Sequence, residues 1–204
     1  KPFMALWVKR LMKFSNHLII LSSIILGFWI DGFLNPLIIK LYLELNFGFL
    51  IFAYWVFAMP EKLHSSAALF YGLVTDLLFS NVIGFNMLFF IAISFLIHLY
   101  VFRFRIFSYF QLSVFFSGSS SFYIACKYLL LSPYNYSYIV LILSFLINAV
   151  LWVGLYLIMR AFRRSIFKIY KTWKSYWASL QFAWVLQVGY FFYFLQSWFS
   201  HLWV

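Results

Sequence analysis

Acidic side chains are scarce in this sequence. Its 204 residues hold four, against 15 lysines and arginines, and charged residues together make up 9%, where ordinary soluble domains carry about 25%. So few carboxylates leave little for paired acid and base catalysis. The formal net charge of +11 would favour nucleic-acid binding in a soluble protein. Here the positive residues flank apolar runs, which indicates membrane surfaces and no nucleic acid.

Cysteine and histidine are equally sparse. Cys126 is the single cysteine of this sequence, which excludes an internal disulfide and a multi-cysteine metal site. The histidines have no metal-ligand spacing. We therefore expect no catalytic residue, no metal and no cofactor, and a protein that is not an enzyme. The four histidines are His17, His64, His98 and His201.

Apolar residues dominate instead. They make up 66% of the chain, and the mean hydropathy of +0.96 is spread over nearly its whole length. This composition predicts an all-α fold, a polytopic helical membrane bundle with about six transmembrane helices. Serines at 117–121 interrupt the fifth run. The expected spans are 18–34, 47–59, 66–80, 85–102, 107–131 and 138–159.

The basic residues orient these spans. Six spans place 13 of the 15 lysines and arginines on one side, with Lys40 and Lys127 left over. Since cytoplasmic ends of spans collect Lys and Arg, both termini are expected in the cytoplasm. The largest basic cluster, at 160–174, follows the sixth span.

The chain divides into a membrane domain, 1–165, with a basic N-terminal lead-in, and a tail, 166–204, that is first basic and then rich in tryptophan. Five of the nine tryptophans fall between 173 and 204. Tryptophan prefers the membrane interface, so the tail is either an interfacial helix or a seventh span. No repeat with a period of 20 to 50 residues is visible.

Asp76 is the most informative single residue, because a carboxylate inside a span is costly unless it is paired, protonated or near the headgroups. It is either a structural acid that binds a neighbouring helix end, around Gly84 to Asn86, or a proton or ligand site. The serine cluster and Asn148 can form hydrogen bonds between helices. A transport pathway would have to use polar residues at membrane depth, and the candidates are Asp31, Asp76, Lys127 and Asn148.

Two blocks of sequence form a recognisable pattern. The first block is Tyr54-Trp55 through Pro60, then Gly72-Leu73-Val74-Thr75-Asp76-Leu77-Leu78, Gly84 and Leu88. The second is Asn148-Ala149-Val150-Leu151-Trp152, followed by Leu157-Ile158-Met159-Arg160. Together the two blocks resemble the MreD family, and the similarity covers roughly residues 15–165. In one departure, the Arg-Pro-Asp/Asn that commonly precedes the second span of that family is Glu44-Leu45-Asn46 here.

The resemblance implies a protein of the bacterial inner membrane, a non-enzymatic membrane scaffold of the rod-shape, lateral peptidoglycan elongation complex. Its implied partners are MreC, the glycan polymerase RodA, a class B penicillin-binding transpeptidase, MreB filaments and membrane lipid. The family's fold is also similar to the substrate-binding membrane subunits of energy-coupling-factor transporters, so a vitamin-transporter subunit is the alternative. The resemblance gives structural or partner-binding roles to Tyr54, Trp55, Gly72, Asp76, Gly84, Asn148 and Trp152.

Overall fold

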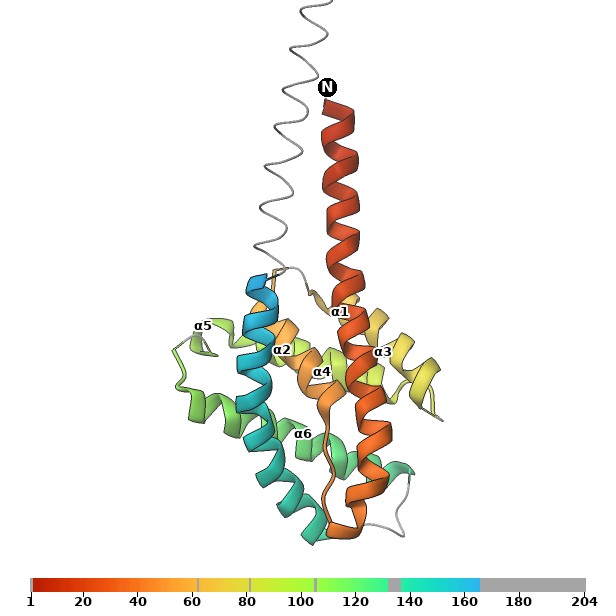
Figure 1. The fold of residues 1–204 in the computed structure, drawn as a ribbon, viewed down its shortest axis with the longest axis vertical. Helices are drawn as coiled ribbons and strands as arrows, with labels where there is room; N and C mark the ends of the chain where they lie inside the picture. The colour runs from red at the N-terminus through yellow and green to blue at the C-terminus, as the bar shows by residue number, and fades with distance from the viewer. Residues whose placement is uncertain (1, 62, 81, 105, 132–136, 166–204) are drawn as a thin grey trace, which may run out of the picture. The chain divides into compact units, whose positions relative to one another are not determined.

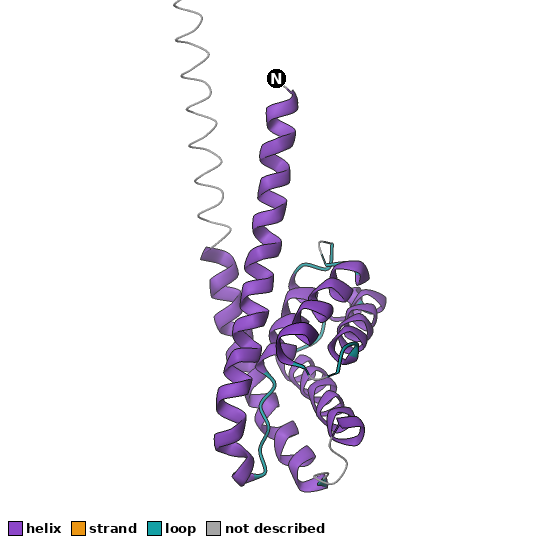
Figure 2. Ribbon diagram, turned by 90° about the vertical axis from the view of Figure 1, so that its right-hand side faces the viewer, coloured by secondary structure: helices purple, strands orange, loops and turns teal. Residues whose placement is uncertain are grey.

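The computed structural model describes residues 2–61, 63–80, 82–104, 106–131 and 137–165, with side chains from residue 16 onward. These residues form helices and connecting loops, without a strand (Figures 1 and 2). The all-α prediction is therefore confirmed. The elements are α1 (Pro2–Ile38), the short 3-10 helix η1 (Ile39–Leu41), α2 (Phe47–Ala58), α3 (Ser65–Phe79), α4 (Phe85–Leu99), α5 (Val101–Phe104), α6 (Tyr109–Leu131) and a last helix, Tyr138–Ser165.

The first helix differs from its prediction at both ends. The basic lead-in and the first span form one helix, and α1 includes Pro36 near its C-terminal end. Proline removes one backbone donor and crowds the carbonyl four residues earlier. Accordingly the α-helix ends at Ile38, two residues after the proline, and gives way to η1.

The serine cluster does not interrupt the fifth predicted run, which corrects that expectation. α6 is continuous from Tyr109 to Leu131. Ser117 donates a hydrogen bond to the carbonyl of Val114 (3.2 Å), and Ser119 donates to that of Phe115 (2.9 Å). Serine side chains that bond back to the preceding turn are compatible with a continuous helix.

Two helical stretches among the described residues are long and apolar enough to cross a membrane, Asn16–Leu41 and Tyr138–Ser165. α2, α3 and α4 are apolar but have 12, 15 and 15 residues. At 1.5 Å per residue these helices are about 18 to 22 Å long, shorter than the roughly 30 Å hydrocarbon layer.

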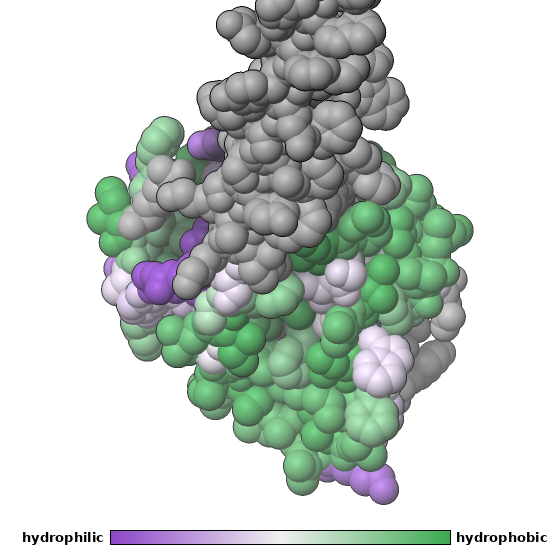
Figure 3. All heavy atoms as spheres, turned by 45° about the horizontal axis from the view of Figure 1, so that its top comes forward, coloured by the Kyte–Doolittle hydropathy of each residue, from purple (hydrophilic) through white to green (hydrophobic). Residues whose placement is uncertain are grey.

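α2 is the central element of the core. Its residues from Gly48 to Val56 are all buried, which is typical of a helix that is hydrophobic on every side. Phe52 stacks on Phe90 of α4, with ring centroids 3.9 Å apart. The outer surface is also apolar: the face in Figure 3 is mostly hydrophobic over the described residues.

The chain forms two compact units, Lys1–Met159 and Arg160–Val204. All contacts described below lie within the first unit. The predicted tail at 166–204, with its alternatives of interfacial helix and seventh span, lies outside the described residues.

Candidate functional site

Asp76 binds the N-terminal end of the next helix. Its carboxylate accepts hydrogen bonds from the backbone N–H groups of Gly84 (2.9 Å), Asn86 (2.9 Å) and Met87 (3.2 Å), and the residue is fully buried. These amides have no partner inside α4, and a negative charge at a helix N-terminus is favourable. The hydrogen bonds expected of a structural acid are therefore present.

Two glycines make this arrangement possible. A Cβ on Gly72 would lie 2.5 Å from the Cα of Met87, so only glycine allows α3 and α4 to come this close. Gly84 has φ of +105°, a backbone conformation that side chains with a Cβ disfavour. The block Gly72 to Gly84 thus builds one tight helical hairpin.

Asp31 repeats the same construction in the hairpin of α1 and α2. Its two carboxylate oxygens accept hydrogen bonds from the backbone N–H groups of Phe47 (2.7 Å) and Gly48 (2.8 Å), at the start of α2. A Cβ on Gly27 would lie 2.8 Å from the Cα of Gly48. Both hairpins therefore use a glycine and, four residues later, an aspartate. The pattern is present in the sequence, but it occurs only in these two hairpins among the described residues and so does not form a visible repeat.

Asn148 holds an extended segment, 44–46, that lies between α1 and the Tyr138–Ser165 helix (Figures 1 and 2). Its side-chain amide donates to the carbonyl of Glu44 (3.0 Å) and accepts from the N–H of Asn46 (3.2 Å). Ser144, one turn earlier, accepts a hydrogen bond from the N–H of Glu44 (2.9 Å).

Asn35 of α1 pairs with the backbone of Leu45, the middle residue of this segment. Its side chain accepts from the N–H of Leu45 (2.8 Å) and donates to the carbonyl of the same residue (2.9 Å). The carbonyl of Asn46 accepts from Leu50 in α2 (3.1 Å). Every backbone N–H and C=O from Glu44 to Asn46 is thus paired, as buried backbone groups outside a helix require.

Glu44 also joins α6 through its side chain. The Lys127 ammonium lies 2.6 Å from the Glu44 carboxylate, with side-chain exposures of 44% and 5%. Sequence reasoning left Lys127 without a partner, because the two residues are 83 positions apart. Glu44 therefore has a cation in this chain, and Lys127 joins the extended segment to α6.

The predicted aromatic residues form a separate group. Tyr54 and Trp152 are buried with ring centroids 6.5 Å apart, and Trp152 stacks on Phe116 of α6 at 3.9 Å. Trp55 donates from its indole N–H to the hydroxyl of Ser23 in α1 (2.8 Å). These residues join α1, α2, α6 and the Tyr138–Ser165 helix.

The structure brings two of the scattered histidines together. The rings of His64 and His98 lie 6.0 Å apart, and His98 contacts the carbonyls of Pro60 (2.9 Å) and Ser94 (2.6 Å) through its two ring nitrogens. Within the described ranges, no three His, Cys, Asp or Glu side chains gather in an arrangement that could hold a metal ion.

The seven residues singled out from the sequence thus fall into three places. Gly72, Asp76 and Gly84 shape the hairpin of α3 and α4, and Asn148 holds the extended segment. The aromatic core contains the remaining three, Tyr54, Trp55 and Trp152. Asn35, Ser144 and Glu44, which complete these contacts, have no site role predicted from the sequence. Asp31 was predicted only as a candidate for a transport pathway.

Comparison with known proteins adds no assignment: no family model, curated protein or solved structure matches this chain.

Proposed function

We propose that this chain is a non-enzymatic membrane scaffold of the rod-shape, lateral peptidoglycan elongation complex, with the role that MreD has in its family. It binds MreC and so couples periplasmic synthases to cytoplasmic filaments. The proposal rests on the sequence resemblance of residues 15–165 and on the use of the buried polar residues within the fold.

The proposal is carried by one observation, that the buried polar side chains are bound within the fold. The four polar residues that a transport pathway would need, Asp31, Asp76, Lys127 and Asn148, all bind other parts of the chain. Three of them bind backbone groups, which must be satisfied in lipid. Side chains occupied in this way support a rigid binding protein over a carrier of protons or solutes.

The contact surface for MreC is best placed on the outside of the α3 and α4 hairpin. Gly72 and Asp76 are buried and cannot reach a partner. The same hairpin exposes Leu77 (64%) and Leu88 (62%). In lipid, helices associate through close packing of such surfaces and not through the hydrophobic effect.

Co-purification tests the scaffold directly. MreC solubilised from native membranes in mild detergent should carry this chain with it, and depletion of the chain should turn rod-shaped cells into spheres. Leu77→Trp should reduce the recovered complex several-fold. Leu130→Trp, on the exposed surface of α6 (70%), is the matched control and should leave it unchanged. If depleted cells stay rod-shaped, or if MreC does not co-purify with this chain, the scaffold proposal is contradicted and the vitamin-transporter alternative is favoured.

We further infer an inner-membrane protein with six crossings and both termini in the cytoplasm. The distribution of 13 of 15 basic residues supports this topology. Each expected span overlaps a helix, and two helical stretches among the described residues, Asn16–Leu41 and Tyr138–Ser165, are long and apolar enough to cross. Alkaline-phosphatase fusions provide the test. A periplasmic signal after Arg164 would contradict six crossings, whereas a periplasmic signal at Val204 alone would make the tail a seventh span.

A further inference from the structure

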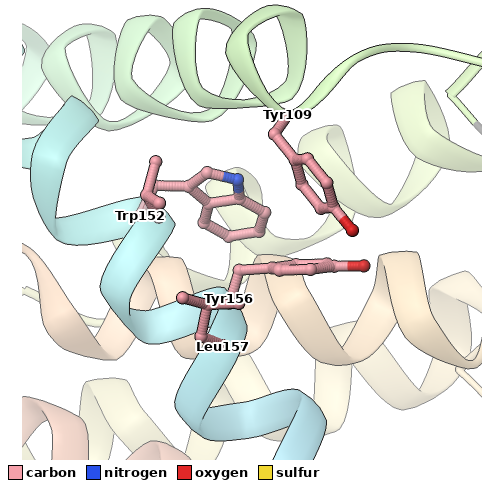
Figure 4. Close-up of a pocket in the computed structure, with 5 residues that line it drawn as sticks. Tyr109, Trp152, Tyr156 and Leu157 are labelled. Carbon is pink, nitrogen blue, oxygen red and sulfur yellow. The ribbon is translucent and has the colours of Figure 1, made fainter.

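An aromatic pocket of about 230 Å³ lies between the start of α6 and the Tyr138–Ser165 helix. Figure 4 shows the indole of Trp152 beside the rings of Tyr109 and Tyr156, and the two tyrosine rings meet edge to face with centroids 5.4 Å apart. The rings that line the pocket therefore pack on one another within the fold. The turn that follows α1 is different, because its apolar side chains face outward.

This turn is closed at its base by one side chain. Asn35 binds both the backbone N–H and the carbonyl of Leu45, and the chain turns back between them (Figure 1). We call residues 36–44 the closed turn. It begins with a proline, whose ring fixes its own φ. The two hydrogen bonds and the proline restrict the backbone of the closed turn before any partner is bound.

Tyr42 has an unusual backbone conformation within the closed turn. Its φ is +56°, and among the described residues no other position except glycine has a positive φ. This left-handed conformation is costly for a bulky side chain, whereas glycine or asparagine adopts it readily. The N–H of Tyr42 donates to the carbonyl of Ile39 (2.9 Å) and so ends the 3-10 helix η1. A tyrosine at a position where a smaller residue would fit the backbone better points to a role for its ring.

The tip of the closed turn is apolar and exposed. Leu41 is 63% exposed and Tyr42 is 54% exposed, and Leu37, one helical turn earlier, is 64% exposed. Lys40 lies between them in the sequence and is exposed as well. Glu44, at the other end of the turn, is buried. The closed turn therefore presents aliphatic and aromatic groups together with one positive charge.

The position of the tip indicates its partner. The stretch of α1 and η1 that is long and apolar enough to cross a membrane ends at Leu41, so the tip lies where this stretch would leave the hydrocarbon layer. Tyrosine prefers this depth, with its ring among apolar groups and its hydroxyl among headgroups. A lysine next to it can extend toward a lipid phosphate. Lys40 is one of the two basic residues that the expected topology leaves over, and a phosphate contact gives it a role.

We propose that the closed turn is a membrane anchor. Leu41 and Tyr42 insert into the headgroup layer of the phospholipid leaflet at which the first span ends, and Lys40 binds a lipid phosphate. Because the turn is closed by Asn35 and Leu45, the anchor fixes the depth of α1 and of the extended segment together. The proposal depends only on a membrane location and is independent of MreC.

Spin labelling of the full chain tests the depth of the tip. Cys126 is the single cysteine, so Cys126→Ser gives a background in which one new cysteine carries the label. In vesicles of phosphatidylglycerol and phosphatidylcholine, a nitroxide on Leu41→Cys should collide with a water-soluble nickel complex several-fold less often than one on Glu61→Cys, at an exposed position in the loop after α2. Equal access of the nickel complex to both labels would overturn the anchor.

Two substitutions of Tyr42 separate its ring from its backbone. Tyr42→Asn suits the left-handed conformation and removes the ring, so access of the nickel complex to the label at 41 should rise several-fold, while the unfolding temperature in detergent should not fall. Tyr42→Trp is the matched control, because it keeps an aromatic ring suited to the membrane interface, and it should leave that access unchanged. The same access in both variants would contradict a role for the ring.

A protein partner is the competing occupant of the closed turn. A label at 41 that is open to the nickel complex in vesicles, and becomes protected only when MreC is added, would replace the anchor by a protein-docking site. The scaffold proposal is decided separately, by MreC co-purification and cell shape.

Discussion

Asp31 and Asp76 occupy the same position in two successive helical hairpins. Each carboxylate accepts hydrogen bonds from the first backbone amides of the following helix, and each follows, by four residues, a glycine in close approach to that helix. The two aspartates thus satisfy amides that have no partner within the helix itself.

Asp76→Asn should destabilise the folded protein by about 1–3 kcal/mol, because an amide cannot accept three backbone hydrogen bonds and its NH₂ faces donors. Asp31→Asn should act in the same direction for α2. Thermal unfolding in detergent would measure both. Glu61→Gln, at an exposed acid in the loop after α2, is the control and should have little effect.

The cellular outcome separates the two interpretations of Asp76. A structural role requires that Asp76→Asn lower the amount of assembled protein and disturb cell shape together. Unchanged protein level and cell shape, combined with loss of proton-dependent uptake of a solute, would show that the residue serves transport.

Gly72→Ala should destabilise the protein by about 1–3 kcal/mol, since the new methyl group would meet the backbone of Met87 and force α3 and α4 apart. Gly118→Ala is the matched control: it is also a helix position, but its Cβ would lie 3.9 Å from the nearest atom, in Phe145. There alanine should be neutral or stabilise by up to roughly 1 kcal/mol. Equal unfolding midpoints for the two variants would contradict the close approach.

Lys127→Met should leave the Glu44 carboxylate buried without its cation, at a cost of about 1–3 kcal/mol. The added change Glu44→Gln should restore most of that loss, because the remaining group is neutral. A double-mutant cycle from denaturation in detergent measures the coupling. Additive effects of the two substitutions would mean that the ion pair contributes nothing to stability.

Asn148→Ala should release the extended segment 44–46 selectively. Hydrogen exchange of the Asn46 amide should speed up by roughly tenfold or more, since its N–H loses its acceptor on the last helix, whereas the Glu44 amide keeps the Ser144 hydroxyl. The amides of Gly84 and Asn86, held by Asp76, serve as the internal reference and should keep their protection. Faster exchange throughout the protein would instead indicate global destabilisation.

The helices were largely predictable from the sequence and the contacts between them were not. The apolar run 66–80 corresponds to α3 at Ser65–Phe79, because an apolar run ended by polar and turn-forming residues is a local signal. The pairing of Glu44 with Lys127 joins residues far apart in the chain, and no local pattern encodes it. The role of Asp31 was only partly predictable from the sequence. Its spacing from Gly27 matches that of Asp76 from Gly72, yet two occurrences in one sequence are too few to stand out as a repeat.

The length of the hairpin helices has a consequence for the surrounding lipid. α3 and α4 each have 15 residues and are about 22 Å long. If both cross the bilayer, their apolar length falls several ångströms short of the usual hydrocarbon thickness, and the membrane must thin around them. Such a hydrophobic mismatch costs a fraction of a kcal/mol per ångström and favours neighbours that are equally short. The hairpin would then gather in thin regions of the membrane together with partner helices of similar apolar length, before any side-chain contact forms between them.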